Sequence, residues 1–389
     1  VVRATVLAFA NKLYIQKLLQ FEKEKKKTQQ IYTIVIMAVL IFGLSLFAVL
    51  KPAGDFSESE RRPLEQLPEL SKKTLLNGDF MDNFENYTND QFPMRDTFRA
   101  VKALAKYYLF GLSDNNELYF ADGHVVKLDF PINRESLDHA ADRFTELYET
   151  YMKDKVNKVV FSVVPDKGYY LAEENGYLAL DYEKLFAQVQ AGMPWAEYVD
   201  ITDCLAIEDY YFTDTHWRQE KLLKTAQKLS QAMGVTSPKA EDFTSIALQR
   251  PFYGVYYGQA ALPMKSETMY ILDNEMLQNC AVYNYATNKN TQVYDMDKLY
   301  GKDQYEVYLS GSQSLLQIEN PNATTNRELI VFRDSFGSSL TPLLMQDYAR
   351  VTLVDIRYIS VEVLGQYIDF KDADVLFLHS SLVLNKKLI

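Results

Sequence analysis

The chain has 389 residues, of which 48% are hydrophobic and 13% aromatic. It can therefore bury one large core or two modest ones, which excludes a disordered polymer. The formal net charge of −11 predicts a body that repels phosphates, and this excludes a nucleic-acid-binding role.

The first fifty residues form a basic segment followed by an apolar one. Residues 1–30 carry seven basic and two acidic side chains, and residues 31–50 carry no charge. Twenty helical residues span about 30 Å, the thickness of a bilayer core, so we predict a transmembrane helix over 31–50. The positive-inside rule then keeps residues 1–30 in the cytoplasm and places everything after Leu50 outside the cell membrane.

Two alternatives to an anchor stay open, a cleaved signal peptide and a buried core helix. A signal peptide usually has an apolar region of about 7–15 residues that ends in small residues at a cleavage site. The apolar stretch of this chain is longer and runs into Lys51-Pro52-Ala53-Gly54-Asp55. An uncleaved, single-pass anchor is therefore favoured. Residues 1–30 contribute a charge of +5 to the formal net charge of −11, which leaves −16 on the exported part.

The region after the apolar stretch contains prolines and charged residues. Residues 51–78 hold Pro52, Pro63 and Pro68, which predicts an extended extracellular tether. Residues 79–110 show apolar periodicity of about 3.6 that is interrupted at Phe92-Pro93, which predicts two helices with a break between them. We place one folded domain over 79–389.

Strands and helices alternate from residue 117 onwards. A hairpin is predicted over 118–128 and an amphipathic helix over 136–151. Buried strands are predicted at 158–164, 195–201, 328–332, 350–356 and 374–379, and helices at 219–233, 338–348 and 361–368. This alternation predicts an α/β domain with a mostly parallel sheet that helices cover.

Residues 251–320 interrupt that alternation. They are rich in tyrosine, glycine and asparagine, and we predict an inserted loop-and-strand region that forms a substrate rim at the carboxyl ends of the strands. Tyr253, Tyr256 and Tyr257 lie in it, and flat rings of this kind stack on sugars. For most of the 28 tyrosines, packing with a solvated hydroxyl is the favoured interpretation.

A serine follows the strand predicted at 328–332. Ser335 stands between that strand and a helix, where free backbone N–H groups and the helix dipole favour a developing oxyanion. The alternative is structural, because Asp334 or Ser335 would also serve as an ordinary N-cap.

A second segment, Asp214-Thr215-His216-Trp217, places a carboxylate two residues before an imidazole at the predicted start of a helix. A turn there brings the carboxylate to Nδ1 and leaves Nε2 free to take a proton from a hydroxyl. Taken alone, the segment is also explained by an aspartate that caps the helix and a histidine that packs in the core. Together the two segments provide the residue set for acyl transfer through a serine ester.

These segments resemble the DHHW family, relatives of the alginate O-acetyltransferases AlgJ and AlgX. The similarity rests on Asp214 to Trp217, on Arg333-Asp334-Ser335-Phe336 and on Asp355-Ile356-Arg357-Tyr358. Three further segments also match family landmarks: Phe92-Pro93-Met94-Arg95-Asp96, Val164-Pro165-Asp166-Lys167 and Phe252-Tyr253-Gly254. The resemblance therefore covers roughly residues 55–385. It implies an SGNH-hydrolase-like three-layer sandwich.

The resemblance also implies roles for individual residues. Ser335 corresponds to the nucleophile, His216 to the base and Asp214 to its orienting carboxylate. The glycine and asparagine that usually complete an SGNH oxyanion hole have no match, so the backbone N–H groups of Gly254 and Ser335 are the candidates. Arg357 is expected to hold a sugar hydroxyl or a carboxylate. Trp217, with the three tyrosines, is a further candidate for substrate contact.

Two functions remain open. The first is a membrane-anchored glycan O-acetyltransferase or acetylesterase, for which the resemblance implies a polysaccharide acceptor and a membrane-bound O-acyltransferase as acetyl donor. The second is a catalytically inactive scaffold or carbohydrate-binding subunit of a complex that exports or modifies exopolysaccharide. No cofactor is expected, and the absence of CxxC, HExxH or clustered histidines argues against a zinc site.

Three further residues carry weaker expectations. Cys204 and Cys280 could form a disulfide outside the cell, but two thiols so far apart are more often unpaired. His379 ends a predicted strand, and because it lacks an aspartate three residues before it, we expect a rim or core histidine.

Overall fold

The computed structural model describes residues 2–387 and 389, with side chains from Tyr14 onwards. The chain divides into two compact units. One holds residues 1–57 and 62–98, and the other holds residues 58–61 and 99–389. The boundary between the two units falls near residue 98, inside helix α4 (Arg95–Leu104).

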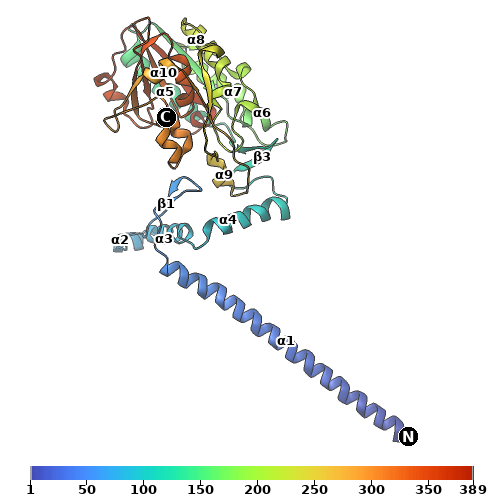
Figure 1. The fold of residues 1–389 in the computed structure, drawn as a ribbon. Coiled ribbons are helices and arrows are strands. Elements are labelled where there is room, and N and C mark those ends of the chain that lie inside the picture. The colour runs from blue at the N-terminus through green and yellow to red at the C-terminus, as the bar shows by residue number, and fades with distance from the viewer. Residues whose placement is uncertain (1, 388) are drawn as a thin grey trace. The chain divides into compact units, whose positions relative to one another are not determined.

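The smaller unit begins with a single long helix, α1 (Val2–Leu50), drawn in blue in Figure 1. The predicted tail and apolar span are therefore parts of one continuous helix. Its segment Tyr14–Leu50 is long and apolar enough to cross a membrane, and none of its most apolar window is buried. Length and composition of this kind are shared by membrane anchors and signal sequences.

The segment predicted as a plain tether contains ordered structure. Strands β1 (Phe56–Ser57) and β2 (Arg62–Pro63) pair as an antiparallel hairpin, and α2 (Lys72–Leu76) follows. The next helices are α3 (Asp79–Asp90) and α4, so the predicted break at Phe92-Pro93 is confirmed. Arg62 fixes the hairpin to the end of α3, because its guanidinium nitrogens lie 2.6 and 2.7 Å from the two carboxylate oxygens of Asp90.

The larger unit is built on an eight-stranded sheet with the order β10-β9-β11-β13-β12-β14-β5-β6. These strands are β5 (Lys158–Val164), β6 (Glu197–Tyr198), β9 (Ala281–Asn284), β10 (Lys289–Thr291), β11 (Leu315–Glu319), β12 (Arg327–Arg333), β13 (Tyr348–Val354) and β14 (Asp374–Ser380). From β13 to β6 the pairs are parallel, and from β13 to β10 they are antiparallel.

The sheet is therefore mixed, with four parallel pairs, as a mostly parallel sheet requires, and three antiparallel pairs that were not predicted. The difference comes from the inserted region, because β9, β10 and β11 extend the sheet instead of forming only a rim. Strand β9 alternates buried and exposed residues, β10 is mostly exposed, and β11 is interrupted by Gln317, so none of them has the long apolar run that marks a buried parallel strand. Their sequence therefore gave little sign of sheet membership.

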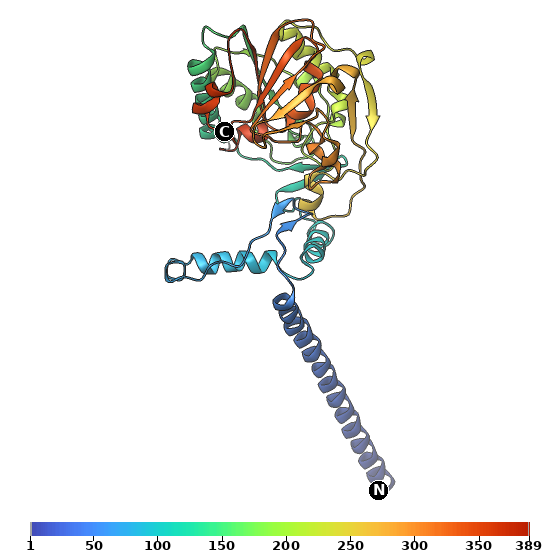
Figure 2. The same ribbon diagram turned by 60° about the vertical axis from the view of Figure 1, so that its left-hand side comes forward.

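Both faces of the sheet are buried. Along β5, Val159, Phe161 and Val163 enter one core, while Val160 and Val164 enter the other. Helices α5 (Arg134–Leu147) and α7 (Tyr182–Gly192) cover the first face, and α8 (Leu223–Met233) covers the second; Figures 1 and 2 show this arrangement. Burial on both sides explains why the central strands read as continuous apolar runs.

Three predicted helices differ from the structure. The helix expected at 338–348 is a short α11 (Phe336–Leu340) followed by a 3-10 turn (Thr341–Leu344), because Pro342 has no N–H to continue an α-helix. The segment at 361–368 is a 3-10 helix (Val361–Gln366). The helix expected from residue 219 starts with a 3-10 turn (Gln219–Lys221), and α8 begins only at Leu223.

The predicted hairpin is confirmed as β3 (Leu118–Ala121) and β4 (His124–Lys127). The remaining elements are η1 (Ala105–Leu109), η2 (Tyr148–Met152), α6 (Gly168–Leu171), η3 (Thr202–Cys204), η4 (Ile207–Asp209), η6 (Ala240–Asp242), β7 (Thr244–Ala247), α9 (Val255–Ala260), β8 (Tyr270–Asp273), α10 (Glu275–Asn279), η7 (Met296–Tyr300), η8 (Gln304–Val307) and α12 (Ser381–Leu384). Cys204 and Cys280 are both free thiols.

Candidate active site

Ser335 stands where β12 ends and α11 begins. The preceding residue, Asp334, is fully buried, and its two carboxylate oxygens accept the backbone N–H of Phe336 at 3.0 Å and of Ser380 at 2.7 Å. Asp334 therefore caps α11 and ties the carboxyl end of β12 to that of β14. Because Ser335 makes no side-chain capping bond, its hydroxyl is available for another partner.

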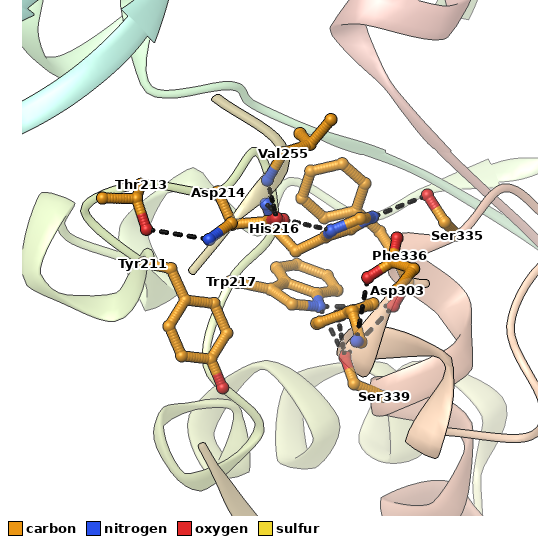
Figure 3. Close-up of polar contacts among 12 residues, drawn as sticks. Tyr211, Thr213, Asp214, His216, Trp217, Val255, Asp303, Ser335, Phe336 and Ser339 are labelled. Atoms are coloured by element: carbon orange, nitrogen blue, oxygen red, sulfur yellow. Dashed lines mark hydrogen bonds and ion pairs between the residues drawn. The ribbon is translucent and has the colours of Figure 1, made fainter. Parts of the chain in front are cut away.

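That partner is His216. Its Nε2 lies 2.7 Å from Ser335 Oγ, and its Nδ1 lies 2.5 Å from Asp214 Oδ1. The same Asp214 oxygen accepts the backbone N–H of His216 at 3.0 Å, so a tight turn sets the carboxylate beside the ring. Figure 3 shows the three side chains in line. With Asp214 ionised, Nδ1 carries a proton and Nε2 is free to accept one from the hydroxyl.

Asp214 is 1% exposed and surrounded by donors. Its second oxygen, Oδ2, accepts the N–H of Val255 at 2.8 Å and lies 3.9 Å from Nη1 of Arg61. Burial by itself raises the pKa of this carboxyl, but His216, Arg61 and the Val255 N–H hold the pKa well below its usual range. The carboxylate therefore stays charged, as a group that orients an imidazole and stabilises its cation must.

Aromatic rings fix the plane of the imidazole. The ring of Tyr305 stacks on His216 with centroids 3.8 Å apart and an interplanar angle of 8°, and Phe336 lies at 4.9 Å. Tyr305 is held in turn by a 2.8 Å hydrogen bond between its hydroxyl and Ser339 Oγ. The imidazole is thus oriented by packing as well as by Asp214.

Trp217 has a structural role that differs from the substrate contact expected of it. Its side chain is fully buried, and its Nε1 donates to Ser339 Oγ at 2.9 Å and to the Phe336 carbonyl at 3.2 Å. A residue with no exposed surface cannot stack on a sugar. Trp217 instead joins the histidine segment to the helix that carries Ser335, as Figure 3 shows.

A second network holds the residues just before Asp214. Glu267 accepts the backbone N–H of Phe212 and of Thr213, each at 2.9 Å, and also the Thr213 hydroxyl. Arg218 pairs with Glu267 at 2.5 Å. On the other side, the Lys167 ammonium donates to the Tyr211 and Phe212 carbonyls at 3.1 and 3.2 Å. Lys167 and Arg218 therefore support the turn.

Lys167 is only 2% exposed, and burial lowers its pKa to about 7 in spite of nearby carboxylates. A buried lysine of this kind binds backbone carbonyls at a lower desolvation cost when it is neutral. Its place next to the Asp214 turn is a structural feature that the sequence pattern alone did not show.

Gly254 does not act as expected either. Its N–H is donated to Thr213 Oγ1 at 3.0 Å, so it is not available to an oxyanion. The residue is needed for space instead. A Cβ at this position would lie 2.3 Å from the Thr213 carbonyl oxygen and 2.4 Å from Asp214 Cα. The backbone N–H of Ser335 remains a candidate oxyanion donor, since it makes no hydrogen bond within the described residues.

Gly254→Ala is expected to reduce any Ser335-dependent activity by about 100-fold or more, because the new methyl group would push the Asp214 turn away and misplaced catalytic groups cost rates of this order. Ester hydrolysis by the purified variant measures this. Gly301→Ala is a milder control, because its Cβ would approach the Lys298 carbonyl at 3.2 Å, away from the turn. Equal rates for Gly254→Ala and the parent would contradict the packing argument.

The three tyrosines of the inserted region lie close in sequence to Gly254, the residue that packs against Thr213 and Asp214. Tyr256 is buried, whereas Tyr253 and Tyr257 form a ring pair with centroids 4.6 Å apart. Tyr253 and Tyr257 line a pocket of about 490 Å³ together with Arg61 and Gly254. Tyr256 has little free surface, so of the three tyrosines predicted to contact substrate only Tyr253 and Tyr257 line this pocket.

Arg357 is committed to a neighbour. Its Nε and Nη2 lie 2.8 and 2.6 Å from the two oxygens of Asp355, a bidentate pair that leaves little of the guanidinium for a substrate. His379 is a core residue, as expected. Burial lowers its pKa to about 4, and its ring packs 4.9 Å from Phe144. Among the described residues no cluster of potential metal ligands occurs.

No family model and no curated protein matches the sequence. Solved structures do match. A DHHW family protein from Eubacterium siraeum aligns at 19% identity over 70% of this chain and 93% of its own, with a TM-score of 0.51. This chain has the fold of a DHHW family protein. PatB1 of Bacillus cereus, in a structure with a sulfonyl adduct, aligns at 16% identity over 70% of this chain and 97% of its own, with a TM-score of 0.53.

The resemblance to DHHW proteins that the sequence motifs predicted is thus confirmed for the fold. The O-acetyltransferase domain of Pseudomonas putida AlgJ also matches, at 14% identity over 65% of this chain and 84% of its own. Its TM-score is 0.37, too low to support an argument. Sequence identities this low show the fold only, so the chemistry of this chain has to be argued from its own residues.

Several residues of the candidate site were not foreseen. Tyr305, Ser339 and Glu267 all lie far from the two motifs in sequence, and each acts by packing on or bonding to a motif residue. Tyrosine, serine and glutamate are common surface residues, so composition and spacing gave no signal. Arg61 belongs to the same group, because it stands in the segment predicted as a tether.

Proposed function

We propose that this protein transfers or removes O-acetyl groups on a cell-surface polysaccharide through an acyl-enzyme on Ser335. The observation that carries the proposal is the continuous series of contacts from Ser335 Oγ through His216 to a buried, ionised Asp214. This series of contacts is not needed if Ser335 only caps a helix or if His216 only packs in the core. The matching AlgJ structure bears the name of an O-acetyltransferase domain, which agrees with the reaction class but is not its basis.

The proposed mechanism has two half-reactions. His216 Nε2 takes the Ser335 proton as Oγ attacks the acetyl carbonyl of a donor, and a tetrahedral oxyanion forms near the N-terminus of α11. Its collapse returns the proton to the leaving group and leaves acetyl-Ser335. A sugar hydroxyl or water, deprotonated by His216, then takes the acetyl group. The acceptor alone decides between transferase and esterase.

The proposal also covers the fold, the residues that contact the sugar and the source of the acetyl group. The fold is taken as an SGNH-hydrolase-like sandwich in which the nucleophile follows the carboxyl end of β12. Tyr253 and Tyr257 are the candidates for sugar contact, and a membrane-bound O-acyltransferase is the proposed acetyl source. An anchored protein would keep Ser335 close to that source, which raises its effective concentration.

Trapping of the acyl-enzyme tests this function. The full chain is incubated with p-nitrophenyl acetate, quenched in acid, and the peptide that contains Ser335 is examined by mass spectrometry. A Ser335-linked acetyl group that disappears in Ser335→Ala supports the mechanism. A second arm uses phenylmethanesulfonyl fluoride, which should modify the same serine. Absence of both modifications in a folded protein would favour the scaffold or carbohydrate-binding alternative.

The proposed topology places the larger unit outside the membrane and the start of α1 in the cytoplasm. The test uses a chain in which the free thiols Cys204 and Cys280 are replaced by serine, so that neither reacts with the label. In this background a membrane-impermeant maleimide should label Glu183→Cys, an exposed position on α7, in intact cells. It should label Lys25→Cys, an exposed position on α1, only after permeabilisation. The reverse pattern, or recovery of a chain cleaved after the apolar segment, would contradict a single-pass anchor.

A further inference from the structure

The tip of the β1–β2 hairpin belongs to the larger unit. Residues 58–61 are part of the larger unit, whereas the two hairpin strands on either side of them are part of the smaller unit. Ser59 packs against Gly258 of α9 so closely that a Cβ on the glycine would lie 1.4 Å from the Ser59 carbonyl oxygen. Arg99 closes the contact, since it pairs with Glu60 at 3.2 Å and donates to the Gly258 carbonyl at 2.9 Å. A glycine with no space for a methyl group marks a specific docking contact.

Arg61 is the last residue of this tip, and it points at the candidate site. Its Nη1 lies 2.7 Å from Asp303 Oδ1 and 3.9 Å from Asp214 Oδ2, and its Nη2 donates to the Tyr253 carbonyl. Its backbone is left-handed, with φ of 52°, which costs free energy for a residue with a Cβ. Such a conformation persists only where the surrounding contacts impose it.

We propose that Arg61 is a positioning residue for the Asp214–His216 pair, and that the activity of Ser335 therefore requires the hairpin tip to be docked. This inference rests on the serine mechanism proposed above. It assigns a part in the site to residues 58–61 of the larger unit, which neither motif contains.

Two physical effects follow from the position of Arg61. Its guanidinium lies 3.9 Å from Asp214 Oδ2, the oxygen that does not contact the imidazole, and attracts that oxygen while Oδ1 contacts Nδ1. It also bridges Asp214 to Asp303, which directly precedes the η8 helix whose Tyr305 stacks on the imidazole. Loss of Arg61 would free both the carboxylate and the ring that orients the histidine.

Charge matters as well as geometry. The titratable or charged groups that act on Asp214 are His216 on its own segment, Arg61 on the hairpin tip, Lys167 before α6, Tyr256 on α9, Asp303 before η8 and Tyr305 on η8. Removing the Arg61 cation favours the form of the Asp214–His216 pair that carries the extra proton. Because the pair must lose that proton to act as a base, the acid limb of kcat/KM is expected to move to higher pH.

The test uses the full chain in detergent micelles, with p-nitrophenyl acetate as substrate. Arg61→Met is expected to lower kcat by about 10- to 100-fold, the size of a positioning effect, with little change in KM and a displaced acid limb. Arg61→Lys keeps the positive charge but loses the second donor nitrogen. Its kcat should therefore lie between that of the parent and that of Arg61→Met. Lys153→Met removes a surface cation that pairs with Glu149 and takes no part in these contacts, so it should leave both kcat and the acid limb unchanged.

A double-mutant cycle separates docking from a local effect. Gly258→Ala pushes the tip away at Ser59 and leaves Arg61 intact, so it should reproduce the Arg61→Met defect. If the glycine acts through Arg61, the double variant should be no worse than either single one. Additive losses would overturn the docking part of the inference. If Arg61→Met does not fold, Arg61→Lys and Gly258→Ala decide, since unchanged kcat and pH profiles in both would overturn it.

Failure of this inference and failure of the proposed function give different results. If Ser335→Ala hydrolyses the ester as fast as the parent, the serine mechanism itself fails. If hydrolysis depends on Ser335 but Arg61→Met matches the parent in kcat and in the position of the acid limb, only the role of the hairpin tip is excluded.

Discussion

Replacement of Ser335 by alanine is expected to abolish ester hydrolysis while the protein stays folded. In serine hydrolases that use such a triad, loss of the nucleophile costs roughly 10⁵-fold or more, because no other group forms the ester intermediate. The side chain makes no capping bond to α11, so its removal should leave the thermal midpoint almost unchanged. Initial rates with p-nitrophenyl acetate and a melting curve measure the two quantities.

A matched control lies one turn further along α11. Ser338 is fully buried, and its hydroxyl makes only a 3.4 Å contact with the Gly311 carbonyl. Ser338→Ala should retain a rate close to that of the parent. Loss of activity in Ser338→Ala with retention in Ser335→Ala would place the chemistry elsewhere and remove Ser335 from the mechanism.

Trp217→Ala is expected to give the largest loss of stability among substitutions near the site. The side chain is fully buried, packs edge-on against Phe336 at 5.3 Å, and donates to Ser339 Oγ. Truncating a buried tryptophan costs about 3–5 kcal/mol, a large part of a typical free energy of unfolding of about 5–15 kcal/mol. The free energy of unfolding from a denaturant titration of the full chain in detergent is the measurement.

Trp217→Phe separates packing from hydrogen bonding. It keeps an aromatic ring but removes the N–H, so the loss should be about 1–2 kcal/mol. Activity should fall more than stability in this variant, because the lost bond joins the histidine segment to the serine helix. A Trp217→Ala protein as stable as the parent would show that the indole is not part of the core of the larger unit.

The sequence predicted the parts of the site that lie close together along the chain. The spacing of Asp214 and His216 is short enough that a single turn determines their contact, and the structure places Nδ1 2.5 Å from Oδ1. In the same way, Ser335 follows an apolar strand at a strand-to-helix junction, which places it at the edge of the sheet. The central strands were foreseen because burial on both faces demands continuous apolar runs.

Contacts between distant segments were not foreseen. Gly254, Trp217 and Arg357 have the right residue types for oxyanion, sugar and carboxylate contacts, but tertiary packing commits each of them to another neighbour. The antiparallel half of the sheet was missed for a related reason, because strands β9, β10 and β11 carry no long apolar run.

The sequence by itself determined the apolar N-terminal segment, the acidic body, the central strands and the two motifs that supply a hydroxyl, an imidazole and a carboxylate. Only the tertiary structure decided that Ser335 Oγ and His216 Nε2, from residues 119 positions apart, lie 2.7 Å from each other. It also decided which residues surround them, including Arg61 from the hairpin tip. The physical reason is that local sequence limits backbone conformation, whereas distances between remote side chains depend on how the whole core packs.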